Sequence, residues 1–120
     1  MEDIELIYNN RLGIAFHWKS NSNKITKKVQ VIFRDTGLLL SKAELLLFST
    51  NIDQLLGKSQ QLLCKDCKNE GRCRSLLLES PVRQITFAVS YNEVVDLKDL
   101  IDNTLFQLNL SSYLSKNGFI

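Results

Sequence analysis

The stretch VQVIFRDTGLLLSKAELLLFSTNIDQLLG, residues 29–57, decides the fold class of this chain. It opens with Val29–Phe33, a β-branched and alternating run that predicts a strand. Arg34–Gly37 supplies turn residues, and Leu38–Leu40 resumes as a second short strand. The first part of the stretch therefore predicts two strands joined by a tight turn.

The second part of the stretch predicts a helix. Ser41 and Glu44 form a capping box, in which the serine oxygen accepts a hydrogen bond from the backbone N–H of Glu44 and the glutamate reaches back. Apolar residues then recur at helical spacing, namely Leu45, Phe48, Ile52 and Leu55. Gly57 suits the end of this helix. Strands followed directly by a helix indicate an α+β protein.

The residues before this stretch predict a β-hairpin. Glu5–Tyr8 and Leu12–Trp18 read as strands, and the asparagines between them tolerate the left-handed conformation of a tight turn. In the second strand one face would carry Ile14, Phe16 and Trp18, with His17 on the other. Phe16 and Trp18 are most simply interpreted as core residues. The polar, lysine-rich segment 19–28 is interpreted as a loop.

The C-terminal half predicts two further strands and a second helix. The strands are Ser75–Glu79 and Arg83–Tyr91, on either side of a turn at Ser80–Pro81. The helix is expected to run from near Asp96 to about Leu114. One apolar stripe on it consists of Leu97, Leu100, Ile101, Leu105 and Leu108, and a second of Phe106, Leu110 and Tyr113. So wide an apolar surface favours burial from two sides, either at the centre of the core or against a second copy of the chain.

Two segments, 39–45 and 94–100, resemble each other at a spacing of 55 residues. Each reads as two apolar residues, an N-cap, two variable residues, an acid and a leucine, which is compatible with a ββα repeat or with the chance similarity of two capped helices. We therefore predict a single α+β domain over residues 1–120, with the cysteine-containing loop 58–74 between the two half-units. The expected architecture is an antiparallel sheet of about five or six strands with two main helices on one face.

Composition excludes several classes of protein. The chain has 120 residues, of which 44% are hydrophobic and 23% charged, as in ordinary globular domains. A net charge of +2 is too small to favour a nucleic-acid partner, and no aromatic residues interleave with the lysines. The apolar runs are far too short to span a membrane. The acidic start lacks the features of a secretion signal, so a cytoplasmic, reducing location is expected.

The three cysteines, Cys64, Cys67 and Cys73, lie within ten residues of one another. Two cysteines separated by two residues can hold one metal ion, because the turn between them directs both sulfurs inward. A structural zinc site has four ligands, and His17, the only histidine, could complete a Cys3His set. Asp66, Glu70 or a second chain are alternative sources of the fourth ligand. Zinc is favoured over an iron–sulfur cluster.

The same cysteines admit two other interpretations. Basic neighbours favour the thiolate form, so Cys64 and Cys67 could instead cycle between dithiol and disulfide. They could also be ordinary cysteines of a surface loop. His17, as a lone histidine on a strand, is more often structural or exposed than a ligand.

An enzyme is the least supported class of function, because no base, nucleophile and orienting group can be named together. The glycines are scattered and form no phosphate-binding loop. The sequence leaves three hypotheses: a small metal-binding or interaction module that uses the cysteine loop, a thiol redox protein, and a homodimeric interaction domain that associates through the second helix.

Three segments, Leu76–Pro81, Gln84–Ala88 and Thr104–Leu108, resemble a family of small bacterial proteins of unknown function. The resemblance covers nearly the whole chain. It implies a cytoplasmic bacterial protein of this length, and it assigns no activity and no site residues.

Overall fold

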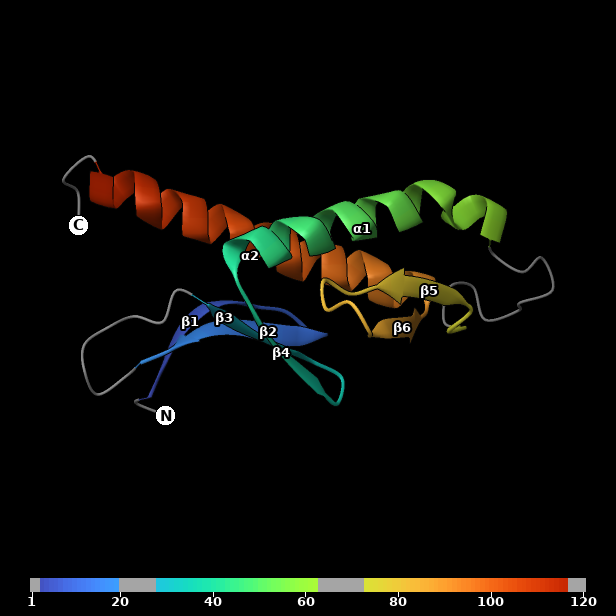
Figure 1. Ribbon diagram of the computed structural model, residues 1–120, viewed down its shortest axis with the longest axis horizontal. Coiled ribbons are helices and arrows are strands. Elements are labelled where there is room, and N and C mark those ends of the chain that lie inside the picture. Colours follow the sequence, from blue (N-terminus) through green and yellow to red (C-terminus); the bar gives the residue numbers. More distant parts are fainter. Residues whose placement is uncertain (1–2, 20–27, 63–72, 117–120) are drawn as a thin grey trace.

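A computed structural model describes residues 3–19, 28–62 and 73–116 of the chain (Figure 1). It is an α+β structure with two helices, a four-stranded antiparallel sheet and a separate two-stranded sheet. The larger sheet has the order β1-β2-β3-β4 and consists of β1 (Ile4–Asn9), β2 (Gly13–Trp18), β3 (Val29–Phe33) and β4 (Thr36–Leu40). The smaller sheet consists of β5 (Leu76–Glu79) and β6 (Thr86–Val89).

The four-stranded sheet follows the predicted strands closely. The β1–β2 hairpin forms around the asparagine turn, and a β-bulge in β1 shifts the register between Leu6 and Tyr8. At the start of β2 the chains approach closely, because a Cβ on Gly13 would collide with the carbonyl oxygen of Ile32 and lie 2.9 Å from the Cβ of Phe33. Glycine is therefore required where β2 meets β3.

Helix α1 (Lys42–Leu62) begins at the predicted capping box. The Ser41 N–H donates to Glu44 Oε1 at 2.9 Å, and the Glu44 N–H donates to Ser41 Oγ at 3.2 Å. The predicted end at Gly57 is wrong, since the helix continues to Leu62. Gly57 is exposed and nothing lies within 4 Å of the position of its Cβ, so a glycine is tolerated inside the helix there.

Helix α2 (Tyr91–Lys116) begins earlier than predicted. The predicted start near Asp96 is wrong, because Ser90 and Glu93 form a second capping box with N–H to oxygen distances of 2.9 and 3.1 Å. Strand β6 accordingly ends at Val89, and Tyr91 belongs to the helix. The apolar pair Val94–Val95 reads as strand in isolation, but the cap places it in the first turns of α2.

The core lies between the helices and the inner faces of both sheets. Its fully buried large side chains include Phe33, Leu40, Phe48, Leu78 and Ile101. The two helices run antiparallel and cross near the middle of the molecule, and their C-terminal halves extend in opposite directions (Figure 1). As a result α1 covers β5, and α2 covers β1 and β2.

The six strands therefore do not form the single sheet that the sequence predicts. The predicted equivalence of segments 39–45 and 94–100 is not confirmed either, since Ser41 is an N-cap and Asp96 lies within α2. The shared signal is the capping box itself, which opens both helices.

The outer face of the four-stranded sheet is apolar and is covered by no described element, since both helices lie on the other face (Figure 1). The register directs to this face the side chains of Ile4, Leu6, Ile14, Phe16, Trp18, Gln30, Ile32 and Leu39. None of them is charged. Phe16 is buried against Trp18, with ring centroids 5.0 Å apart, whereas Trp18 itself is 45% exposed. Trp18 is thus not the core residue that the sequence suggested.

Neither described helix is long and apolar enough to span a membrane.

Candidate functional site

The predicted cysteine site is described only at its last member. Cys64 and Cys67 lie outside the described residues. Cys73 is partly exposed and lies three residues before β5. The next residue, Arg74, is held by Glu93 at the start of α2, with Nε to Oε1 at 3.0 Å and Nη2 to Oε2 at 3.1 Å. The C-terminal end of the cysteine segment is therefore anchored beside the first turn of α2.

His17 lies elsewhere. It is partly buried on the inner face of the sheet, where it pairs across the strands with Glu5, and its Nδ1 is 3.2 Å from the carbonyl oxygen of Lys28. With Glu5 it lines a hollow of about 230 Å³ that also includes Gln107 and Leu108, late in α2.

The structure does not bring His17 and Cys73 together. Cys73 is adjacent to the residue that binds Glu93, whereas His17 shares a hollow with Gln107. An α-helix rises about 1.5 Å per residue, so the part of α2 between Glu93 and Gln107 is about 20 Å long. In the described ranges, no three His, Cys, Asp or Glu side chains lie close enough to hold a metal ion. The metal prediction stays a prediction for the cysteines, and His17 does not lie beside Cys73, the one cysteine among the described residues.

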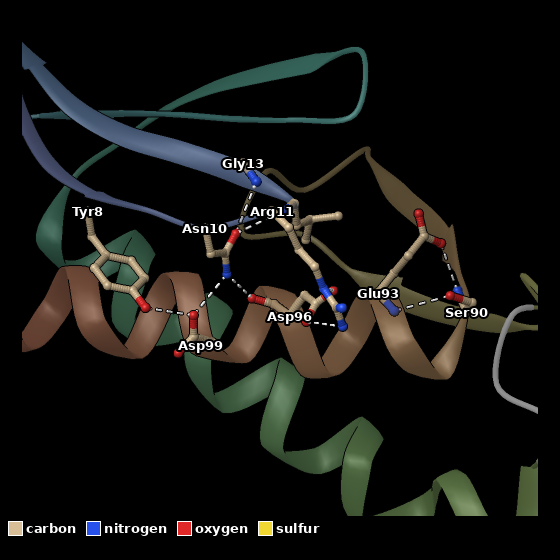
Figure 2. Close-up of polar contacts among 9 residues, drawn as sticks. Tyr8, Asn10, Arg11, Gly13, Ser90, Glu93, Asp96 and Asp99 are labelled. Carbon is tan, nitrogen blue, oxygen red and sulfur yellow. Dashed lines mark hydrogen bonds and ion pairs between the residues drawn. The ribbon is translucent and has the colours of Figure 1, made fainter.

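A polar network docks the β1–β2 hairpin onto α2 (Figure 2). Asn10 is its centre: Nδ2 donates to the Asp96 carbonyl and to Asp99 Oδ2, both at 2.9 Å, while Oδ1 accepts from the N–H groups of Leu12 and Gly13. Tyr8 also donates to Asp99, at 2.8 Å, and this hydrogen bond is the main reason that the pKa of the Tyr8 phenol is raised. The carboxylate of Asp99 is thus engaged in tertiary contacts, and that of Asp96 is paired with Arg11 of the same hairpin at 2.8 Å.

A second polar cluster joins the helices where they cross. The Lys98 ammonium donates to Asp102 at 2.8 Å and to Asp53 of α1 at 2.6 Å, and these bonds raise the pKa of Lys98. Ser49 of α1 donates to Asp102 at 2.9 Å. Together these contacts fix the antiparallel register of α1 and α2.

The most distinctive surface is the part of α2 beyond the crossing. We call Phe106, Leu110 and Tyr113 the α2 stripe; their exposed fractions are 59%, 39% and 61%. The opposite side of the same helix is held in the core by Ile101 and Leu105. From residue 103 to residue 115 the sequence contains no charged residue. The second apolar stripe that the sequence predicts to be buried is therefore exposed in the single chain.

Two of these features were missed in the sequence, although signals for them exist. The capping box at Ser90 and Glu93 has the same pattern as the one at Ser41 and Glu44. In the sequence, Asn10 can be recognised only as a turn residue, because the α2 residues that its side chain contacts lie more than 80 residues away.

No known family model, curated protein or solved structure matches this chain significantly. The resemblance to a family of small bacterial proteins therefore stays a prediction, and the function of this chain is inferred from its geometry alone.

Proposed function

We propose that this chain is an interaction module that forms a homodimer through the α2 stripe. The observation that carries the proposal is the combination of a firmly held helix with an exposed apolar stripe on its outer side. Exposed apolar patches of this kind on a folded protein mark interaction surfaces. Aromatic residues such as Phe106 are enriched at the centres of interfaces, and charged residues are depleted there.

A second copy is the partner that best fits this surface. The uncharged run 103–115 offers no charge for an acidic or basic partner, and it brings no like charges together when two copies meet. Two α2 helices related by a two-fold axis would place each stripe against the other in an isologous interface. Leu46 of α1 is also 51% exposed, and it lies one turn before Ser49, which donates to Asp102, the residue one turn before Phe106.

The expected dimer is concentration-dependent. The three side chains of the α2 stripe expose roughly 300 Å² in all, given the usual area of aromatic and leucine side chains. A stable interface of standard size buries about 800 Å² per partner. The stripe with its neighbours therefore supports a dimer at the weak end of the range.

Sedimentation velocity over a wide range of protein concentration tests the proposal. We expect the natural chain to shift from monomer to dimer as its concentration rises, and Phe106→Glu to remain monomeric because two added carboxylates would face each other. Gln107→Glu is the matched control, since it adds the same charge to the next residue, whose side chain lines the hollow beside β1 and β2 instead. A natural chain that stays monomeric at millimolar concentration contradicts the proposal.

We further propose that Cys64, Cys67 and Cys73 bind zinc. Two points support this: the CxxC spacing with a third cysteine nearby, and the anchoring of Arg74, which holds the end of the segment against Glu93. A zinc ion held by these thiolates would take its fourth ligand from a residue other than His17.

A further inference from the structure

A groove runs along the seam between α1 and the two-stranded sheet. One hollow of about 270 Å³ is lined by Leu55 and Lys58 of α1 and by Leu77 of β5. A neighbouring hollow of about 460 Å³ is lined by Pro81, Arg83 and Ile85 in and after the β5–β6 turn. Both hollows are also lined by Asn51 and Glu79, so they lie side by side along the seam. We call this surface the α1–β5 groove.

The edge of β5 that borders the groove carries backbone hydrogen-bonding groups. Strand β5 pairs only with β6 among the described strands. The Ser80 N–H donates to the Ile85 carbonyl at 3.2 Å, and antiparallel strands alternate between hydrogen-bonded and non-bonded pairs. Leu78 therefore bonds to β6, whereas the N–H and C=O groups of Leu77 and Glu79 point away from it.

Two independent contacts agree with this alternation. The Glu79 carbonyl accepts from Asn51 Nδ2 of α1 at 3.0 Å, on the groove side of β5. On the other strand Ala88, which lies opposite Leu77, directs its carbonyl away from β5 to Arg34 at 2.8 Å. The edge thus presents the N–H and C=O of Leu77 and the N–H of Glu79 to the groove.

The side chains of the groove combine apolar surface with positive charge. Leu77 is 69% exposed, the highest value among the large hydrophobic residues of the described chain, and Ile85 is 38% exposed. Lys58 lies in one hollow and Arg83 in the other. Neither cation takes part in an ion pair among the described residues. Among the described residues that line the groove, Glu79, which is shared by both hollows, is the single carboxylate.

We propose that the α1–β5 groove binds an extended peptide segment of a partner protein as an added strand on the edge of β5. Backbone hydrogen bonds to Leu77 and Glu79 would hold the segment, and side chains at alternate positions, about 7 Å apart, would enter the two hollows. The apolar surface of the hollows favours a segment with apolar residues at its centre, and charge complementarity with Lys58 and Arg83 favours acidic residues at its two ends. The short edge limits the paired part to four or five residues.

The proposal does not depend on self-association, because the α2 stripe contributes nothing to the groove. The two ideas can therefore fail separately. The Phe106→Glu variant should bind the peptide with the affinity of the natural chain.

The probe is the peptide acetyl-Glu-Leu-Thr-Leu-Glu-amide, titrated into the full chain labelled with nitrogen-15. We expect saturable shifts, with the amide protons of Leu77 and Glu79 moving downfield as they form hydrogen bonds. The same peptide with N-methylated leucines should bind at least tenfold more weakly, because it cannot complete the ladder. Peptide binding that is indifferent to N-methylation would show side-chain contact alone and would overturn strand addition.

Paired proline variants locate the binding edge. Leu77→Pro removes the N–H that faces the groove and should weaken binding of the peptide at least tenfold. The variant should still fold, since proline is tolerated on edge strands. Leu39→Pro is the matched control, because Leu39 lies within β4, an edge strand of the other sheet, and is also exposed. Undiminished binding by Leu77→Pro, shifts confined to β1 or β4, or no saturable shift at all would each overturn the proposal.

Discussion

At the scale of single residues, Glu93 joins three separate segments. It accepts from the Ser90 N–H, holds Arg74 in a paired contact, and lies 3.7 Å from Arg34 Nε. Burial raises the pKa of Glu93, but the Arg74 hydrogen bond, the Ser90 N–H and the charges of both arginines outweigh it and lower the pKa overall. We expect Glu93→Gln to lower the free energy of unfolding at pH 7 by about 1 kcal/mol, measured by urea unfolding.

The pH dependence and a control variant follow from the same contacts. A carboxyl whose pKa is lowered on folding stabilises the protein above its ordinary pKa and loses this effect as the pH falls through the lowered value. The difference between Glu93→Gln and the natural chain should therefore close only below the ordinary pKa of glutamate. Glu44→Gln keeps its own capping box and has no arginine pair, so it should cost less than about 0.5 kcal/mol. Equal effects of the two variants would contradict a role for the arginines.

Residue roles of this kind are only partly predictable from sequence. The capping oxygens of Ser41 and Glu44 act within four residues, so the pattern alone reveals them. Arg34 adopts a left-handed backbone with φ of 55° and donates to Ala88, 54 residues away. The sequence indicated a turn there, but it carries no signal of the distant partner.

At the scale of elements, α1 contains a residue that weakens it. Gly57 lies within the helix, is exposed, and has open space where a side chain would begin. Glycine inside a helix costs about 1 kcal/mol relative to alanine. We expect Gly57→Ala to raise the free energy of unfolding by about that amount, with a higher midpoint in thermal unfolding followed by circular dichroism.

The control is the same substitution in β2. A Cβ at Gly13 would collide with the backbone of Ile32, so Gly13→Ala should lower the free energy of unfolding by about 2 kcal/mol. If Gly57→Ala were neutral or destabilising, the helix would not continue through this residue as described.

The elements themselves were largely predictable and their ends were not. Periodicity located both helices, because the apolar side that faces the core sets the spacing of the leucines. The early start of α2 was missed because Val94 and Val95 have a local preference for strands. In the folded chain the Ser90 cap and the burial of Val94 in the core stabilise the helix instead. Tertiary packing thus overrides local preference at this boundary.

At the scale of the whole molecule, the length of α2 bears on the zinc proposal. Because about 20 Å of helix separates the neighbours of Cys73 from those of His17, His17→Ala should leave zinc content unchanged. Cys64→Ser and Cys73→Ser should each lower it. Elemental analysis of protein purified without chelator measures this, and the absorption of a cobalt-substituted sample counts the thiolate ligands.

Each outcome of that experiment is informative. Loss of metal in His17→Ala would contradict the separation of His17 from the start of α2. Metal-free protein with three titratable thiols would contradict the zinc proposal. A reversible disulfide between Cys64 and Cys67 in such protein would favour the thiol redox hypothesis instead.

The division of the strands into two sheets could not be predicted from the sequence. Strand signals give the number and the approximate places of strands, but pairing depends on which edges meet after the helices have crossed. Here the side chain of Arg34, in the β3–β4 turn, donates to the carbonyl of Ala88 on the edge of β6. This carbonyl would otherwise be available to a neighbouring strand.

The uncharged outer face of the four-stranded sheet has a consequence for the protein in concentrated solution. The folded protein exposes apolar surface on this face, so attraction between molecules does not require unfolding. Electrostatic repulsion opposes it only weakly, since the net charge is +2 at pH 7 and the isoelectric point is about 8.5. Solubility should thus rise on mild acidification away from the isoelectric point, and sulfate salts should precipitate the native protein readily.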